Sequence, residues 1–209
     1  MSSPDVIGAA PNLPLVLASA SAVRTRLLTN AGVTHLVDPA DIDEASVRDS
    51  LLAVGAAHCS IAETLAELKA QKISDRHVGA MVLGADQVLS CAGELFEKPA
   101  DLDHVRSHLE ILRGQTHSLH TSACMVRDGS VIWHENCESV LDIRMLSDGF
   151  IEEYVATVGT EVCQSVGAYF LEGLGVQLFS RIDGDFFDIV GLPMLPLLEF
   201  LRNNAMLKT

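Results

Sequence analysis

The length of 209 residues, the 48% of hydrophobic residues and the positive mean hydropathy exclude a disordered or fibrous chain and fit one medium-sized α/β domain. The formal net charge of −14 argues against a protein that coats nucleic acid, because such proteins neutralise phosphates with many basic side chains. A small anionic substrate would need a local cluster drawn from only 14 lysines and arginines, so each cation near a motif is informative.

No apolar run reaches the roughly 18 residues that a membrane helix needs, and residues 1–12 lack the basic and apolar regions of a secretory signal. We therefore expect a cytoplasmic protein with no membrane partner, in which residues 1–12 are flexible. The five cysteines are scattered and form no C-x-x-C pair, which favours reduced packing thiols over a disulfide or zinc framework.

The first part of the chain alternates between strand and helix patterns. It predicts a strand over residues 13–18, a helix that ends at Gly32, a strand over 35–37, an acidic loop over 38–44, and a helix that the capping box from Ser60 to Glu63 opens. The apolar positions of this last helix, Leu68 among them, recur at helical spacing and leave Lys69 and Lys72 on or beside the opposite face.

The middle of the chain contains the strongest strand signal, an uninterrupted small and apolar run over residues 80–85 that ends at Asp86. A hairpin of residues 88–90 and 94–96 follows, and then a helix that Asp101 caps and Gly114 ends. Residues 117–127 and 130–143 predict two long strands joined at a tight turn, and we expect this hairpin to form a second lobe. A helix over 147–156, a glycine-rich segment over 167–175, a strand over 176–182 and a helix over 192–201 complete an α/β pattern.

Three segments carry side chains suited to a phosphate substrate. Ser19 and Ser21 lead into a helix whose free N–H groups attract anions, and Arg24 lies in its first turn. Asp86 follows a buried strand, where α/β proteins bind ligands, and could hold a metal or orient water. Lys98 is kept extended by the proline after it. Taken singly, these residues suit equally a serine cap with a surface arginine, a turn aspartate and a solvated lysine.

Several segments occur together in one order along the chain. They are Leu17-Ala-Ser-Ala-Ser21 with Arg24, Asp41-Ile-Asp-Glu44, Gly84-Ala-Asp-Gln-Val88, Glu97-Lys-Pro99, Gly114-Gln-Thr-His117, Gly167-Ala-Tyr169, Glu172-Gly173 and Val190-Gly-Leu-Pro193. In this order, from Leu15 to Arg202, the sequence resembles the Maf family of nucleotide pyrophosphatases. The resemblance implies a mixed twisted sheet with flanking helices, an ITPase-like fold of two lobes around a central cleft, and a single Maf-like domain over residues 1–209.

The resemblance also implies a reaction and a role for each residue. The enzyme would cut a nucleoside triphosphate between its α and β phosphates, with Mg²⁺ or Mn²⁺ as cofactor. Ser19, Ser21 and Arg24 would hold phosphate, Glu44 and Asp86 would bind the metal or activate water, Lys69 and Lys98 would neutralise the leaving pyrophosphate, and Glu172 would contact the substrate. Asp86 matches the family's proton acceptor, although either carboxylate could act as the base.

Some positions depart from the family pattern or divide its branches. The family's usual arginine before Arg24 is Val23 here, and its usual asparagine before Val-Val-Gly-Leu-Pro is Asp188. Gln87 stands where many members have threonine and resembles the branch that acts on 7-methyl-GTP, whereas the threonine branch prefers dTTP and UTP. His117 matches no metal motif, so we expect it to face solvent or to be satisfied within the core.

Two other functions stay open on these residues. One is a non-catalytic nucleotide-binding regulator of cell division, which the family's older name of septum formation inhibitor suggests. The other is a phosphatase that removes only the terminal phosphate, since similar residues could surround a γ phosphate. The resemblance also suggests a homodimer, and the acidic charge excludes a nucleic acid polymer as partner.

Overall fold

The computed structural model describes residues 14–208, so the predicted flexible segment 1–12 lies outside the described residues. The elements, in chain order, are β1 (Leu15–Leu17), α1 (Ala22–Asn30), β2 (Leu36–Val37), α2 (Glu44–Ala53), α3 (His58–Ser74), β3 (Met81–Cys91), β4 (Glu94–Phe96), α4 (Leu102–Leu112), β5 (Thr116–Arg127), β6 (Ser130–Ile143), α5 (Asp148–Val158), η1 (Gly159–Gln164), η2 (Leu174–Leu178), β7 (Phe179–Asp183), α6 (Phe186–Val190) and α7 (Met194–Asn203). Within residues 14–208, each helix is too short or too polar to cross a membrane.

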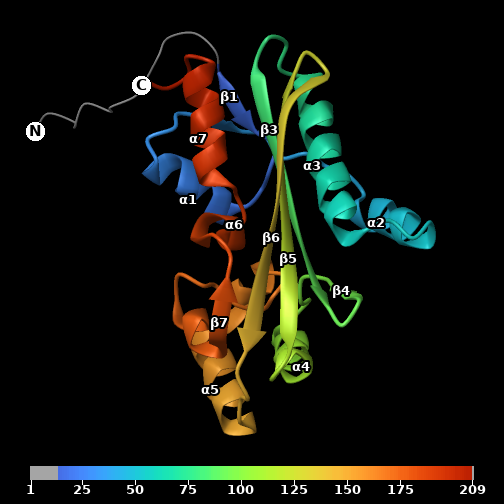
Figure 1. The fold of residues 1–209 in the computed structure, drawn as a ribbon, viewed down its shortest axis with the longest axis vertical. Coiled ribbons are helices and arrows are strands. Elements are labelled where there is room, and N and C mark those ends of the chain that lie inside the picture. Colours follow the sequence, from blue (N-terminus) through green and yellow to red (C-terminus); the bar gives the residue numbers. More distant parts are fainter. Residues whose placement is uncertain (1–13, 209) are drawn as a thin grey trace, which may run out of the picture. The chain divides into compact units, whose positions relative to one another are not determined.

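The seven strands of the described residues form one mixed sheet in the order β2-β1-β3-β5-β6-β7, with β4 paired to β3. β1 lies between β2 and β3 and is parallel to both, whereas the β3–β4 and β6–β7 pairs are antiparallel. Helices flank these strands (Figure 1). The structure therefore confirms the predicted α/β class with a mixed sheet.

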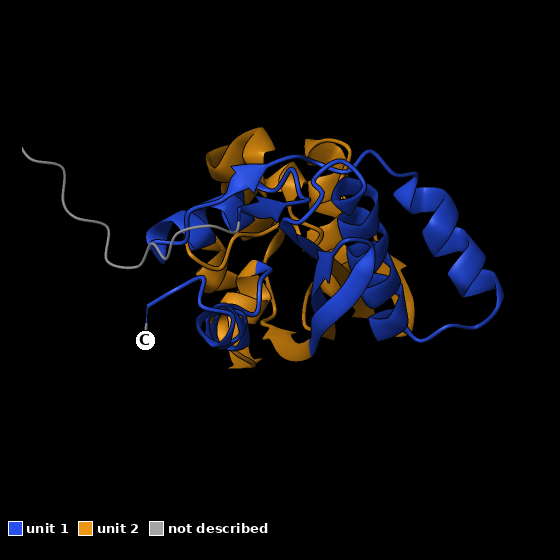
Figure 2. Cartoon of the chain, turned by 90° about the horizontal axis from the view of Figure 1, so that it is seen from above, with its two compact units in different colours: residues 1–86, 121–136, 191–209 blue, residues 87–120, 137–190 orange. Residues whose placement is uncertain are grey.

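The chain divides into two compact units (Figure 2). Among the described residues, unit 1 holds 14–86, 121–136 and 191–208, and unit 2 holds 87–120 and 137–190. The prediction that the hairpin of residues 117–143 forms a second lobe is wrong, because residues 121–136 belong to unit 1. β5 is long enough to contribute to both cores, with Leu119 in that of unit 2 and Cys124 in that of unit 1.

In unit 1, α3 approaches β3 closely because Gly84 has no side chain. A Cβ atom on Gly84 would lie 2.1 Å from the carbonyl oxygen of Ala66 and 2.8 Å from the Cβ atom of Ala70. These two alanines are fully buried in a core that they share with residues of β1 and β3. In Figure 1, α3 covers one face of this part of the sheet, and α1 and α7 lie on the other.

The buried face of α3 differs from the sequence prediction. Its buried residues form one stripe that consists of Ile61, Ala62, Leu65, Ala66, Lys69, Ala70, Ile73 and Ser74. The prediction that Lys69 lies on or beside the opposite face is therefore wrong, and Leu68 is only half buried. Alanines mark the contact stripe because small side chains let the helix lie close to the strand.

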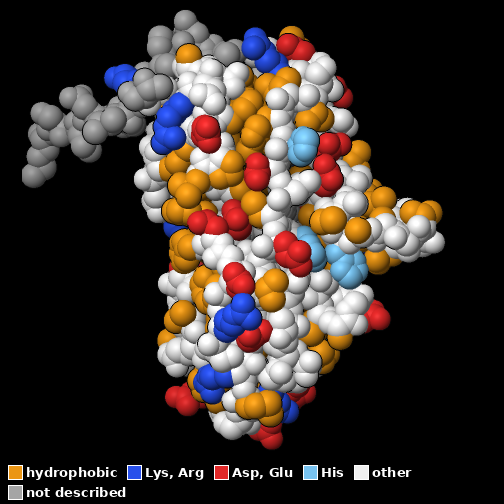
Figure 3. Space-filling view, in the orientation of Figure 1, with side chains coloured by type: hydrophobic (Ala, Val, Ile, Leu, Met, Phe, Trp, Pro, Cys, Tyr) orange, Lys and Arg blue, Asp and Glu red, His pale blue; other side chains and the backbone are white. Residues whose placement is uncertain are grey.

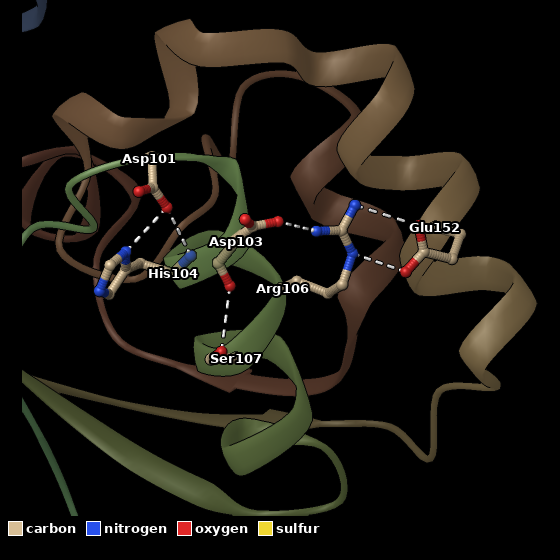
Figure 4. Close-up of polar contacts among 6 residues, drawn as sticks. All are labelled: Asp101, Asp103, His104, Arg106, Ser107 and Glu152. Carbon is tan, nitrogen blue, oxygen red and sulfur yellow. Dashed lines mark hydrogen bonds and ion pairs between the residues drawn. The ribbon is translucent and has the colours of Figure 1, made fainter.

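Unit 2 has a core of its own, in which α4 packs against α5 and η1. Arg106 of α4 joins the two helices, since its guanidinium donates to Glu152 of α5 and to Asp103 at 2.6 Å each (Figure 4). Asp101 caps α4 as predicted by accepting the backbone N–H of His104 at 2.9 Å. The five cysteines of the chain are free thiols in the structure, and Cys91 and Cys124 are buried.

Three predicted boundaries are wrong. α3 begins at His58 with no side-chain cap, so Ser60 lies inside the helix and forms no capping box. The strand expected over residues 88–90 is continuous with the one expected over 80–85, because both belong to β3. The first half of the strand expected over 176–182 is instead the 3-10 helix η2.

Two helices, α2 and α6, were not predicted. α2 has no buried residue and so lacks the apolar stripe by which an amphipathic helix is found in a sequence. Its hydrophobic side chains remain at the surface, as Leu52 does with 41% exposure, and the space-filling view shows hydrophobic atoms over this helix (Figure 3). α6 is only 5 residues long, too short for a helical repeat to be visible.

Candidate active site

Asp86 lies within β3, and the prediction that the strand ends there is wrong because β3 continues to Cys91. The element that ends beside Asp86 is the neighbouring parallel strand. Leu17, the last residue of β1, pairs with Leu83. Asp86 therefore lies just beyond the carboxyl end of β1, the place where open α/β sheets bind ligands, and is 7% exposed there.

Lys69 reaches Asp86 from α3. Its Nζ atom lies 2.5 Å from Oδ1 of Asp86 and 2.8 Å from Oε1 of Glu44, the first residue of α2. One ammonium thus holds two carboxylates, of which Asp86 is buried and Glu44 is 46% exposed. The structure brings together three residues that only the family resemblance had connected.

Arg24 joins this cluster from α1. Its Nη1 atom donates to the hydroxyl of Ser19 at 3.0 Å and to the carbonyl of Ala85 at 2.8 Å, and its Nε atom donates to the carbonyl of Gly191 at 2.8 Å. Ser21 is the N-cap of α1, and its hydroxyl accepts the backbone N–H of Arg24. The guanidinium is thus bound to the backbone immediately before the buried carboxylate.

The comparison with known proteins identifies the family of the chain. The model of the family described as Maf-like protein matches residues 14–204. The chain belongs to the Maf family. This Maf protein is 47% identical to the 7-methyl-GTP pyrophosphatase of Mesorhizobium japonicum over 90% of the chain and 94% of that relative. It is also 47% identical to the nucleoside triphosphate pyrophosphatase of Paramagnetospirillum magneticum, over 91% of the chain and 98% of that relative.

A more distant likeness exists among solved structures. A HAM1 protein from Coxiella burnetii is similar over 75% of this Maf protein and 92% of its own chain, at 13% sequence identity and a TM-score of 0.41. At that score the likeness is too slight to support an assignment.

One charged cluster consists of Asp86, Lys69, Arg24 and Glu44, and its charges interact in a largely buried setting. Burial raises the pKa of the Asp86 carboxyl, and the positive charges of Lys69 and Arg24 oppose this rise. Burial lowers the pKa of the Arg24 guanidinium, but an arginine starts so far above neutral pH that the group stays charged. A carboxylate whose pKa is raised is a stronger base than an ordinary aspartate.

The donor atoms of the cluster suit a divalent cation. The carboxylates of Glu44 and Asp86 both face the Lys69 ammonium, so the space between them already accepts a positive charge. No group of three or more His, Cys, Asp or Glu side chains within residues 14–208 is placed to hold a metal ion. A metal here would take two carboxylates and complete its shell with water and phosphate oxygens, which is the usual coordination of Mg²⁺ in proteins.

The remaining predicted site residues, Gln87, Lys98 and Glu172, belong to unit 2. Lys98 follows β4 and Glu172 precedes η2, and both are exposed. Gln87 uses its side-chain nitrogen to donate to the carbonyls of Asp188 and Ile189, at 3.0 and 3.1 Å. The roles that the resemblance implies for these three residues stay predictions.

His117 is a core residue, as one of the two predicted outcomes has it, but it is only partly satisfied there, because its buried Nδ1 atom has no hydrogen-bond partner among the described residues. Its Nε2 atom lies 2.8 Å from the hydroxyl of Tyr169, and burial lowers the pKa of the imidazole to about 4. Ala168, the residue before Tyr169, has a φ of +57°, and its carbonyl accepts a hydrogen bond from the hydroxyl of Tyr154 at 3.3 Å. His117 therefore supports the glycine-rich segment and is not placed as a metal ligand.

Sequence analysis missed two glycines that position the cluster. Gly84 lets α3 approach β3, and Gly191, at φ +115°, turns its carbonyl toward Arg24. Both glycines lie within segments that carry the family resemblance. A glycine beside a motif was the available signal, since such positions often need close backbone approach or a positive φ.

Proposed function

We propose that this Maf protein hydrolyses a nucleoside triphosphate between its α and β phosphates, giving the nucleoside monophosphate and pyrophosphate. The observation that carries the proposal is the buried carboxylate of Asp86, bound by Lys69 and close to Arg24 and Glu44 at the carboxyl end of β1. The names of its relatives, which are pyrophosphatases at 47% identity, support the same activity.

Asp86 takes the proton of the attacking water in this proposal. Burial raises the pKa of its carboxyl, which brings the group closer to the pKa of an efficient general base at neutral pH. Lys69 holds the carboxylate in place at 2.5 Å and keeps it charged until the proton arrives. Asp86 is thus a stronger base than an ordinary aspartate, and Lys69 keeps its carboxylate in a fixed position.

The cations and the end of α1 balance the charge of the triphosphate. Lys69 and Arg24 supply two positive charges, and Ser19 with the N-terminus of α1 supplies hydrogen-bond donors for phosphate oxygens. Because Arg24 and Lys69 are largely buried, water screens their charges less than it would at the surface. Phosphoryl chemistry depends mainly on such positioning and charge compensation.

Glu44 and Asp86 would hold one Mg²⁺ or Mn²⁺ ion. When bound, the metal lowers the pKa of its water and offsets phosphate charge. Glu44 is 46% exposed, so it can turn from Lys69 toward a metal at little desolvation cost. The resemblance supports the same pair of ligands.

The first candidate substrate is the modified nucleotide 7-methyl-GTP, and the unmodified nucleotides dTTP and UTP are the alternatives. Relatives at 46–47% identity carry the name 7-methyl-GTP pyrophosphatase. The enzyme would work in the cytoplasm, where nucleoside triphosphates are made and used, and we expect a homodimer from the resemblance.

The direct test is a panel of nucleoside triphosphates with Mg²⁺ or Mn²⁺, in which pyrophosphate and orthophosphate are both measured. We expect pyrophosphate alone, with the fastest release from 7-methyl-GTP. Asp86→Asn should lower kcat by about 1,000-fold while substrate still binds. Asp75→Asn, at the exposed end of α3, is the matched control.

The two other functions predict different products. Orthophosphate in place of pyrophosphate would identify a phosphatase that removes the terminal phosphate. Tight nucleotide binding with neither product would identify a non-catalytic regulator.

A further inference from the structure

Gln87 directly follows Asp86 on β3, and its side chain binds the end of α6. The Nε2 atom donates to the carbonyls of Asp188 and Ile189 at 3.0 and 3.1 Å. The last carbonyls of a helix have no partner within the helix, so these two bonds cap α6. Ile189 is 5% exposed and belongs to the core of unit 2, so the capped end of α6 is itself held in place.

Arg24 makes the corresponding connection on the other side of Asp86. Its Nη1 atom donates to the carbonyl of Ala85, and its Nε atom donates to the carbonyl of Gly191, both at 2.8 Å. Ala85 and Gln87 are the two neighbours of Asp86 in the chain. Gln87 binds the carbonyls of Asp188 and Ile189 directly. Ala85 is connected to Gly191 through the side chain of Arg24.

The alternation of side chains along a strand limits what Gln87 can do. Neighbouring residues of a β-strand point to opposite faces, so the side chain of Gln87 points away from the face where Asp86 meets Lys69. An amide nitrogen has two hydrogens, and two carbonyls accept from this one. These two hydrogen bonds therefore act on Asp86 through the backbone that it shares with Gln87.

We infer that Gln87 is a positioning residue for Asp86, which it holds by capping α6. This inference rests on the proposed function, because it assigns Asp86 the role of base. The inference also distinguishes two possible roles of the glutamine at this position. A residue that reads the base of the nucleotide would alter substrate preference, whereas a positioning residue would alter the rate for all substrates alike.

The side chain of glutamine has the reach and the donors that this task needs. Glutamate has the same length but offers only acceptors to two carbonyls, and methionine has the same length but no donor. Asparagine is one methylene shorter. Gln87→Met therefore removes both hydrogen bonds with little change in volume, and Gln87→Glu replaces them by repulsion.

The experiment compares wild type, Gln87→Met and Gln87→Glu on 7-methyl-GTP and GTP with Mg²⁺, with pyrophosphate release as the readout. We expect kcat to fall by about 10-fold to 100-fold for Met, and further for Glu, because small displacements of a reacting group are this costly. KM should change by less than about 3-fold, and the ratio of kcat/KM for the two nucleotides should stay within about 2-fold of the wild-type ratio.

Gln164→Met and Gln164→Glu are the matched controls, since Gln164 is an exposed glutamine of η1 in the same unit. Both should behave as wild type. Thermal unfolding of each variant shows whether the fold is intact.

Three outcomes would overturn the inference. A changed substrate ratio with kcat preserved would make Gln87 a base-reading residue, and unchanged kinetics in Gln87→Met would leave it no role. A Gln87→Met protein that did not fold would show a structural role in place of a positioning one. Failure of the proposed function itself is distinct, because wild type would then release no pyrophosphate from any nucleotide.

Discussion

The Nζ atom of Lys69 lies 2.5 Å from a carboxylate oxygen of Asp86, and the two side chains are only 8% and 9% exposed. Burying a charged pair costs desolvation energy that stability alone rarely justifies. We therefore propose that the pair belongs to the active site, in which Lys69 would keep the carboxylate charged and aligned.

Lys69→Met tests this relationship through the pH dependence of activity. Burial raises the pKa of Asp86 and Lys69 opposes the rise, so removing Lys69 should raise that pKa further. The acid limb of kcat/KM should move to higher pH, and the plateau should fall by at least about 100-fold. Lys72→Met on the exposed face of the same helix is the control and should keep the wild-type profile. An unmoved acid limb in Lys69→Met would contradict the pairing.

Glu44→Gln tests the proposed metal site. Replacing one carboxylate by an amide removes a charged ligand, so the Mg²⁺ concentration for half-maximal activity should rise at least about 10-fold, the loss that even an outer-shell change brings. A chelator should abolish wild-type activity, and added Mg²⁺ or Mn²⁺ should restore it. Asp49→Asn, an exposed change on the same helix, should leave the metal titration unchanged. Full activity in the chelator would argue against a metal.

His117 should make the fold sensitive to acid. Burial lowers the pKa of His117 to about 4 from 6.5, so the unfolded chain binds a proton at higher pH than the folded chain does. The contribution of His117 to the free energy of unfolding is fully present above about pH 6.5. It falls by up to about 3 kcal/mol as the pH drops to 4.

The measurement is urea unfolding at several pH values. His117→Gln cannot titrate and can still hydrogen-bond Tyr169, so its stability should decline less between pH 6.5 and 4 than that of wild type. His134→Gln, at an exposed position of β6, should decline as wild type does. Parallel curves for wild type and His117→Gln would show that another group governs the decline.

Gly84→Ala should impair stability and activity together. The new methyl group would lie 2.1 Å from the Ala66 carbonyl oxygen, so α3 must shift away from β3 and carry Lys69 with it. Overpacking of this kind costs roughly 1–3 kcal/mol. Gly149→Ala in α5 has open space around its Cβ position and should instead stabilise by about 0.5–1 kcal/mol. Differential scanning calorimetry and pyrophosphate release on both variants provide the test.

The parts of the fold that the sequence predicted are those with a strong local signal. The β1 strand, the Asp101 cap of α4 and the long strands β5 and β6 each follow from apolar pattern, capping or turn chemistry. α2 escaped because it buries no residue, and Lys69 was placed on the wrong face because large apolar side chains, not alanines, defined the expected stripe. Local pattern cannot show how closely a helix lies against a strand.

The candidate site residues, like the fold, were predictable only in part. Ser19 and Arg24 were recognisable from the strand and helix around them, whereas Glu44 and Lys69 came only from the family resemblance. No pattern in the sequence indicated that Gln87 would bind two carbonyls a hundred residues away, because such contacts depend on tertiary structure.

The alternation along β3 has a consequence for how this protein can vary in evolution. Gly84 and Asp86 face α3, and Gln87 faces α6, so the duties of the strand are divided by odd and even positions. An insertion or deletion of one residue upstream within the strand would exchange the two sides, turning the acid away from Lys69. We therefore expect homologues to tolerate length changes in their surface loops while the residue count of this strand stays constant.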